Sequence, residues 1–449
     1  MDEFEAVTEG VAARVVPDDA ERERLARTAA RVVADAEAAA ADLPVEADVV
    51  QVGSTARGTW VSGDRDIDVF VRFPPDLPRR ELERYGLEVG RAVLPDGHEE
   101  YAEHPYVKGT RGGFEVDLVP CYAVEDATAI QSAVDRTPFH TAYLAERLDD
   151  DSAEEVVLTK AFLKGVGVYG SDLRTRGFSG YLTELLVLEC GGFRAFLEAV
   201  RRWHPPVELD PEGHAAREFD DPLVVVDPTD PERNVAAVLS AGNVARLVHH
   251  ARAFLDEPRV EAFEPRDPDP LDADAMAAHL ERRGTTPFAV RFPAPDLVDD
   301  QLYPQLEKSL SGVVGELDRR GFDVLRAATF ADGTAVLFVE CEVAERPRIA
   351  RHEGPPVWVD RHATGFYGKY ADGDAYGPFV DGERYVVERE RGRATAREWL
   401  ESDDLLDVSL GVAVAEALRD GYEVLEGEET TALAAEFGVE LARYFDPRP

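Results

Sequence analysis

The chain has 449 residues, of which 44% are hydrophobic, and its 90 Asp and Glu against 49 Lys and Arg give a formal net charge of −41. This length exceeds that of one ordinary domain, so we expect about two to four domains with sizeable cores. Residues 1–25 are acidic without an apolar stretch, and no run of about 18 apolar residues occurs, so neither export nor membrane insertion is expected.

The first part of the chain mixes helices and strands. Residues 18–42 have the periodicity of an amphipathic helix, with aspartates available as N-caps. The stretches "ADVVQVGS", "RDIDVFVRF" and "GGFEVDLVPCYAV" read as strands, and "PRRELERYGLEVGRAVL" as a helix between the second and third. Residues 1–142 are therefore predicted to form a mixed α/β domain.

The pattern then becomes helical. The segments "TPFHTAYLAERL", "SAEEVVLTKAFLKGVGVYG", "GFSGYLTELLVLECGGFRAFLEAVRRW" and "NVAAVLSAGNVARLVHHARAFL" predict a helical middle domain over residues 143–258. Residues 259–284 are rich in Pro and Asp and read as a connector. Residues 285–449 read as a second α/β module with an aromatic and glycine-rich insertion. The predicted fold class is α+β and multidomain.

Three aspartates form the first candidate site. Asp66 and Asp68 project from one face of their strand, and Asp117 sits among apolar residues of another strand. Such carboxylates are costly unless a positive charge compensates them, and Mg²⁺ prefers oxygen ligands that leave room for water and phosphates. The alternative is an exposed acidic strand end, and a D-x-D pair alone is weak evidence in so acidic a chain. We interpret Asp64, just before this strand, as a solvated turn residue.

A turn upstream of these aspartates strengthens the metal hypothesis. "GSTARGTW" follows a strand and is expected to open a short helix, where Gly53 allows close backbone approach and Ser54 can donate to a phosphate oxygen. Arg57 follows about one turn later and can reach the same phosphates.

In this order, the turn, the D-x-D strand and the third aspartate resemble the nucleotidyltransferase superfamily, which includes DNA polymerase β and the poly(A) polymerases. "SAVDRTPFHTAYL", "LTKAFLKGVGVYGSDLRTRGFSGYLTELL" and "DPTDPERNVAAVLS" are similar to segments of the archaeal, class I CCA-adding enzymes. The resemblance runs over nearly the whole chain and is strongest over residues 50–245. It implies a polymerase β-like mixed-sheet head, a helical domain that completes the nucleotide pocket, and C-terminal modules that bind RNA.

The resemblance also implies roles by position. Asp66, Asp68 and Asp117 are expected to ligate two Mg²⁺ ions, although the family often has Glu at the first position. The expected nucleotide contacts are, for the triphosphate, Ser54, Arg57, His140, Lys160 and Tyr169, and, near the ribose or base, Thr137 and Arg233. The implied reaction is template-independent addition of C, C and A to tRNA from CTP and ATP, with release of pyrophosphate. We expect a cytoplasmic homodimer.

The residues themselves support these roles unequally. Thr137 is a good N-cap, which puts His140 in the first turn of a helix, yet a helix-start histidine can equally pack under the domain. Lys160 and Lys164 share one helix face, and the alternative is two solubilising lysines. Tyr169 is as compatible with a core position as with a phosphate contact.

Basic residues that stand out from the acidic background are candidates for RNA binding. The expected groove for the tRNA acceptor stem uses Arg174, Arg176, Arg201 and Arg202, with His204 nearby; salt bridges to neighbouring acids are the alternative. An aromatic group is expected to stack on RNA or to form a small core, and it comprises Phe366, Tyr367, Tyr370 and Tyr376.

Two rival functions remain open. A poly(A) polymerase-like enzyme would use ATP alone, and a decayed fold would bind RNA without catalysis; the presence of all three aspartates argues against decay. The acidic surface is interpreted as an adaptation to molar salt, because salt screens self-repulsion while hydrated carboxylates maintain solubility. Cys121, Cys190 and Cys341 form no CxxC pair, which favours a reducing cytoplasm over a disulfide framework or zinc site.

Overall fold

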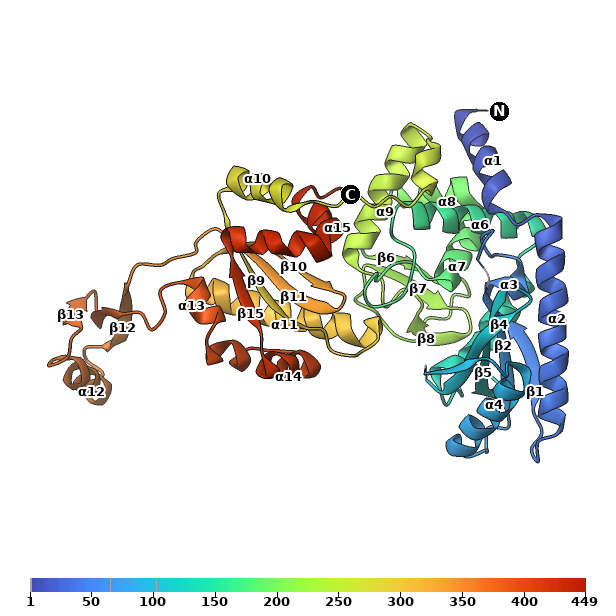
Figure 1. The fold of residues 1–449 in the computed structure, drawn as a ribbon, viewed down its shortest axis with the longest axis horizontal. Helices are drawn as coiled ribbons and strands as arrows, with labels where there is room; N and C mark the ends of the chain where they lie inside the picture. The colour runs from blue at the N-terminus through green and yellow to red at the C-terminus, as the bar shows by residue number, and fades with distance from the viewer. Residues whose placement is uncertain (1, 65, 102) are drawn as a thin grey trace. The chain divides into compact units, whose positions relative to one another are not determined.

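The computed structural model describes residues 2–64, 66–101 and 103–449. The chain divides into two compact units, Met1–Arg266 with Pro449, and Asp267–Arg448 (Figure 1). The predicted α+β multidomain class is confirmed, whereas the finer boundaries at residues 142, 258 and 284 stay predictions. Within the described ranges no helix is long and apolar enough to cross a membrane.

The first unit begins with a mixed sheet in the strand order β1-β2-β5-β4-β3. Its strands are β1 (Asp48–Val52), β2 (Asp66–Phe73), β3 (His98–Tyr101), β4 (Pro105–Arg111) and β5 (Phe114–Tyr122). Among the described residues of this sheet, β2 and β5 are the only strands that pair in parallel. Helices α2 (Asp19–Ala41) and α4 (Arg79–Val93) bury their apolar residues against one face of this sheet, which leaves the other face for the short α3 (Gly53–Arg57).

The rest of the first unit is mainly helical. Its helices are α1 (Glu3–Val15), α5 (Thr137–Ala145), α6 (Asp150–Gly165), α7 (Gly180–Cys190), α8 (Phe193–Val200) and α9 (Ala241–Asp256), with the 3₁₀ turns η1 (Ala133–Arg136) and η2 (Val260–Phe263). Phe4 of α1 joins Phe162, Phe193, Phe254 and Phe263 in one aromatic core, so the N-terminal helix packs with helices far from it in sequence.

A small sheet inside the helical part was not expected from the sequence. It consists of β6 (Val207–Leu209), β7 (Leu223–Asp227) and β8 (Asp230–Asn234). The prediction of one helical segment starting at Asn234 is therefore wrong at its beginning, because the hairpin ends there and α9 starts only at Ala241, after its N-cap Ser240. The buried valines of β7 explain the strand, since β-branched residues suit a buried sheet.

The second unit contains a four-stranded sheet in the order β10-β11-β9-β15. Its strands are β9 (Thr286–Pro293), β10 (Val324–Ala331), β11 (Thr334–Cys341) and β15 (Glu423–Glu426). Apolar cores cover both faces. The surrounding elements are α10 (Ala273–Arg283), α11 (Asp299–Arg320), α13 (Ala396–Leu400), η3 (Asp403–Asp407), α14 (Val412–Asp420), η4 (Gly427–Leu433) and α15 (Ala434–Phe445).

The aromatic and glycine-rich insertion folds as a separate layer of the second unit. The strands β12 (Ile349–Pro356), β13 (Tyr376–Asp381) and β14 (Arg384–Glu390) form a sheet in the order β12-β14-β13, beside α12 (Asp360–Tyr370). Phe366 and Tyr370 pack with His352 as its small core, whereas Tyr367 and Tyr376 remain exposed. Only these two aromatics of the predicted group are available for stacking.

Candidate active site

Two neighbouring strands carry the three predicted metal ligands. Asp68 of β2 lies directly opposite Asp117 of β5, and Asp66 lies two residues before Asp68. Ile67 and Val69 are fully buried beneath α2 and α4, so the alternation of side chains turns Asp66 and Asp68 to the other face. The three carboxylates therefore share one face of the sheet.

Burial is the main cause that raises the pKa of all three carboxylates. Burial, followed by the charges of Asp117 and Asp66, raises the pKa of Asp68 to about 6. Burial also raises the pKa of Asp66 and of Asp117, while the Lys108 ammonium opposes the shift at both. The Arg57 guanidinium opposes it at Asp68. Because it is unfavourable for all three acids to be ionised at once, a cation bound between them would be stabilising.

The residues present fit a divalent cation. Oδ1 of Asp117 is buried without a hydrogen-bond partner in the described part of the chain, and Lys108 Nζ lies 3.7 Å from it. No group of three or more His, Cys, Asp or Glu among the described residues is placed to hold a metal unaided. Such an open site suits Mg²⁺, which commonly binds one or two carboxylates and completes its shell with water and substrate phosphates.

Gly53 joins β1 to α3 directly beside this site. Val52 pairs with Asp68 across the sheet, and Gly53 has a left-handed φ of 79°. A Cβ built on Gly53 would lie 2.1 Å from Oδ2 of Asp68, so only glycine fits. The predicted short helix is present as α3, in which Ser54 directly follows Gly53.

Glu184 of α7 binds both basic residues predicted to hold the triphosphate. It is fully buried, with Arg57 NH2 at 2.7 Å and Lys160 Nζ at 3.0 Å. The Thr59 hydroxyl also donates to Glu184, and Arg57 NH1 donates to Thr141 at 3.0 Å. Burial alone would raise the pKa of Glu184, but Lys160 and Arg57 outweigh it and lower that pKa. This network connects α3, α5, α6 and α7.

Lys160 is occupied by these partners. Its buried ammonium also donates to the Thr59 carbonyl oxygen at 2.9 Å and contacts the Thr59 hydroxyl at 3.3 Å. Its role as a phosphate contact stays a prediction, and here it serves as a counter-charge. Sequence reasoning missed Glu184, although a single acid inside the apolar "YLTELLVL" was a usable signal.

Asp64 was predicted to be a solvated turn residue, but its carboxylate is bound to a lysine of α6. Its carboxylate accepts from Lys164 Nζ at 2.8 and 3.0 Å, which ties the segment before β2 to α6. Tyr169 lies nearby, with its ring 5.4 Å from Lys164 Nζ. A Cβ built on Gly180 would lie 3.1 Å from the Tyr169 hydroxyl and 3.7 Å from Lys160 Nζ, so the two predicted nucleotide contacts meet over that glycine.

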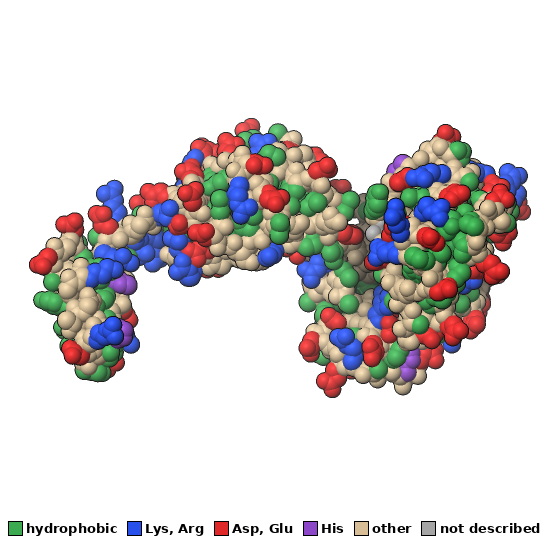
Figure 2. Space-filling model, turned by 90° about the horizontal axis from the view of Figure 1, so that it is seen from below, with side chains coloured by type: hydrophobic (Ala, Val, Ile, Leu, Met, Phe, Trp, Pro, Cys, Tyr) green, Lys and Arg blue, Asp and Glu red, His purple; other side chains and the backbone are tan. Residues whose placement is uncertain are grey.

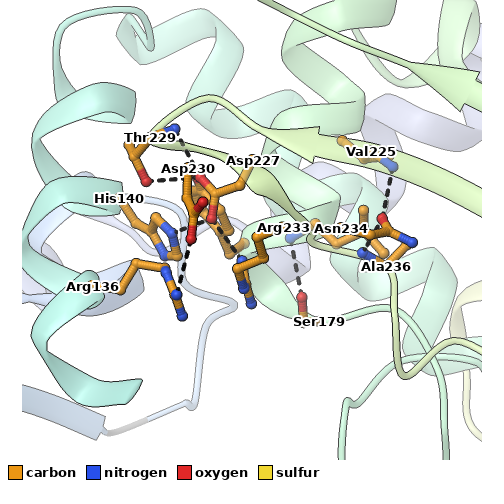
Figure 3. Close-up of polar contacts among 12 residues, drawn as sticks. Arg136, His140, Ser179, Val225, Asp227, Thr229, Asp230, Arg233, Asn234 and Ala236 are labelled. Carbon is orange, nitrogen blue, oxygen red and sulfur yellow. Dashed lines mark hydrogen bonds and ion pairs between the residues drawn. The ribbon is translucent and has the colours of Figure 1, made fainter. Parts of the chain in front are cut away.

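Asp227 brings together His140, which was predicted to contact the triphosphate, and Arg233, which was predicted to lie near the ribose or base (Figure 3). Its buried carboxylate lies 2.8 Å from His140 Nε2 and 2.7 Å from Arg233 NH1. Thr229 donates its N–H and hydroxyl to the same carboxylate. The ring of Tyr181 stacks on His140 at 3.8 Å between centroids. Asp227, which closes the run of valines in β7, was not identified from the sequence.

Thr137 does not cap its helix. The 3₁₀ turn η1 leads directly into α5, so Arg136 stands at the N-cap position and no side chain caps the helix. Thr137 is instead the first helical residue, followed by Pro138, and His140 keeps its predicted place in the first turn. Arg136 pairs with Asp230 at 3.1 Å beside the Asp227 cluster (Figure 3).

The predicted RNA-binding arginines lie at two separate places. The backbone carbonyl of Arg176 accepts from Ser240 and Asn243 at the start of α9, and Arg174 is exposed on the same loop. Arg201 and Arg202 are exposed near the end of α9, where the Arg201 carbonyl accepts from Arg252. The four therefore do not form one compact cluster, and their contact with RNA stays a prediction.

A second set of arginines, which sequence reasoning missed, lies on β12, β14 and their flanking residues. We call it the arginine strip, and it comprises Arg346, Arg348, Arg351, Arg389, Arg391 and Arg393. Ala350 pairs with Arg389, and the Arg391 N–H donates to the Arg348 carbonyl, so the two segments run side by side. Figure 2 shows basic side chains gathered in the second unit, while acidic side chains spread over the face in view. The repeated arginines of "RPRIAR" and "RERGR" were the available signal.

A mixed sheet with three carboxylates on adjacent strands, beside a glycine-serine turn, defines the class of nucleotidyltransferases. Residues 36–140 match the family model of the nucleotidyltransferase domain. Residues 154–264 match that of the tRNA nucleotidyltransferase second domain, and residues 283–427 that of the CCA-adding enzyme C-terminal domain.

Proteins that are similar to this chain over its full length identify a narrower family within the nucleotidyltransferases. The chain is 64% identical to a CCA-adding enzyme of Haloarcula marismortui and 62% identical to one of Halorubrum lacusprofundi, in each case over 100% of both chains. It is 44% identical to a CCA-adding enzyme of Methanoregula boonei, over 96% of this chain and 93% of that protein. The chain belongs to the family of CCA-adding enzymes, as the sequence motifs predicted.

Proposed function

We propose that this protein adds the 3′-terminal C, C and A to tRNA without a template, using CTP and ATP and releasing pyrophosphate. Full-length similarity to CCA-adding enzymes supports the substrates. The observation that carries the chemistry is the pairing of Asp68 with Asp117, with Asp66 on the same face. We further propose two Mg²⁺ ions, a homodimer and a cytoplasmic location.

The carboxylates of Asp66, Asp68 and Asp117 would hold the cations. When bound, such ions lower the pKa of the attacking 3′ hydroxyl and offset charge on the leaving phosphates. Gly53 leaves room for a phosphate to approach the backbone, and the Ser54 hydroxyl is expected to donate to it. Arg57 is held near the site by Glu184 and Thr141, where its charge favours anionic phosphates.

The arginine strip is proposed to hold the tRNA backbone, together with exposed Tyr367 and Tyr376. Arg348 and Arg389 have no ion-pair partner in the described ranges, so their charges are available to phosphates. Duplex RNA is recognised largely by shape and by backbone contacts, which suits arginines on a rigid sheet.

The function is tested with tRNA lacking its CCA end and labelled CTP or ATP in molar KCl. Asp68→Ala and Asp117→Ala should abolish incorporation and pyrophosphate release without unfolding the protein, and Asp96→Ala, at an exposed acid of the same unit, serves as the matched control. Full activity of either site variant would exclude the metal assignment. An A tail without C would favour the poly(A) polymerase alternative, and no pyrophosphate release by the unaltered protein would favour the non-catalytic one.

A further inference from the structure

Lys108 of β4 lies on the same face of the five-stranded sheet as the three predicted metal ligands. It pairs with Asp117 of β5, which in turn pairs with Asp68 of β2, and Asp68 pairs with Val52 at the end of β1. Residues that lie directly opposite each other on neighbouring strands point to the same face. The side chains of Lys108, Asp117 and Asp68 therefore form one row across the sheet, with the turn at Gly53 at its β1 end.

The ammonium of Lys108 is only partly occupied by the protein. Its Nζ lies 3.1 Å from Oε2 of Glu115 and 3.7 Å from Oδ1 of Asp117, and the second distance is too long for a hydrogen bond. The side chain is 28% exposed, and these two acids are its ion-pair partners within the described ranges. Because an ammonium has three donors, Lys108 can bind a further anion without leaving Glu115.

Lys108 differs in this respect from the two other lysines near the site. Lys160 is buried among its partners, and Lys164 donates to both oxygens of Asp64, so each ties α6 to another segment of the fold. Lys108 and Glu115 instead lie on β4 and β5, which are already paired along their length. An exposed ion pair of this kind contributes little to stability, so a structural role accounts poorly for the lysine.

The two ends of the row suit the two reactants of a nucleotidyl transfer. Ser54 and Arg57, which are expected to contact the triphosphate, belong to α3 at the β1 end, whereas Lys108 is at the β4 end. In an in-line displacement the attacking oxygen and the leaving pyrophosphate are on opposite sides of the phosphorus. An α-phosphorus held over Asp68 and Asp117 is then attacked from the β4 side, where Lys108 can meet the last phosphate of the attacking strand.

We propose that Lys108 binds the last internucleotide phosphate of the tRNA 3′ end and thereby directs the terminal hydroxyl toward the incoming nucleotide. A phosphate that approaches this face is repelled by Asp66 and Glu115, which lie opposite each other on β2 and β5. The ammonium on the neighbouring strand offsets that repulsion where the attacking strand has to pass. The inference rests on the proposed function and adds a residue that binds the attacking strand rather than the nucleotide.

The test is a double-mutant cycle between the side chain and the phosphate. Lys108→Met removes the charge but keeps the aliphatic stem, and a tRNA with a neutral methylphosphonate at its last linkage lacks the opposite charge. We expect each change alone to weaken tRNA binding about tenfold, and both together to weaken it no more than one of them. K108M should also raise KM for tRNA, leave KM for CTP unchanged, and lower the slope of log affinity against log KCl by about 1.

Lys308→Met is the matched control, because Lys308 is an exposed lysine of α11 in the second unit and the substitution removes the same charge. It should change neither tRNA binding nor KM for tRNA. Fully additive losses in the cycle would show that the side chain and the phosphate act independently, and they would overturn the proposal. Equal tRNA binding by K108M and the unaltered protein would overturn it as well.

Lysine acylation of the unaltered protein covers the case in which K108M does not fold. The chain has five lysines, so mass spectrometry can follow each of them. We expect tRNA that lacks its last nucleotide to protect Lys108 and to leave Lys308 reactive, whereas CTP alone protects neither. Equal labelling of Lys108 with and without tRNA would overturn the proposal. The binding and labelling readouts need no catalysis, so a protein that binds tRNA but adds no nucleotide would refute the proposed function separately.

Discussion

Replacing Glu184 with Gln perturbs the network that joins the head sheet to the helices. Glu184 is the counter-charge of Arg57 and Lys160, whose side chains are only 7% and 3% exposed. Gln preserves the shape and an acceptor for Thr59 but leaves two buried cations without a carboxylate. Removing one partner of a buried ion pair costs about 3–5 kcal/mol, so we expect the free energy of unfolding of E184Q to fall by that amount.

The same network predicts a pH dependence and a partial rescue. The pKa of folded Glu184 lies below its ordinary value of 4.5, so the stabilisation is complete above that value and is lost as the pH falls through the folded pKa. Adding Lys160→Met to E184Q removes one of the two unpaired cations and should restore part of the stability. Urea unfolding at constant molar KCl, followed by circular dichroism, measures both. A loss below about 1 kcal/mol, or strictly additive losses, would refute this account.

Three further predictions address the site, the RNA surface and the salt requirement. Gly53→Ala should reduce incorporation by about a hundredfold or more without loss of the fold, since its Cβ would lie 2.1 Å from Asp68 Oδ2; activity assays with circular dichroism decide. Arg348→Ala with Arg389→Ala should weaken tRNA binding and lower the slope of log affinity against log KCl by about 2, while Arg319→Ala, which breaks an exposed pair with Glu316, should not. Folding and activity should persist in molar KCl and decline in dilute buffer, and highest activity in dilute buffer would contradict the halophilic interpretation.

Local patterns in the sequence predicted the parts of the site that lie within one element. The D-x-D alternation put Asp66 and Asp68 on one face, and the glycine-serine turn gave α3 in its place. The pairing of Asp68 with Asp117 followed from the family resemblance, since register between distant strands leaves little trace in either strand alone. Thr137 was misjudged because η1 runs directly into α5, which removes the free helix start that capping rules assume.

What could not be predicted is which charges neutralise one another across the fold. Glu184 and Asp227 are one acid each in apolar segments, and their importance appears only when their partners from other elements are in place. Burial makes these pairings selective, because an unpaired charge is far more costly inside the protein than on its surface.

Lysine usage in this acidic chain follows the same principle. The chain has five lysines, and three of them, Lys108, Lys160 and Lys164, contact acids around the carboxylate site. The compact ammonium of Lys160 fits between the Thr59 carbonyl and Glu184, where the planar fork of an arginine would need more space and more acceptors. Lys160 is the one buried lysine among the five, and there a small cation sits among buried oxygens, whereas Lys308 and Lys369 are exposed.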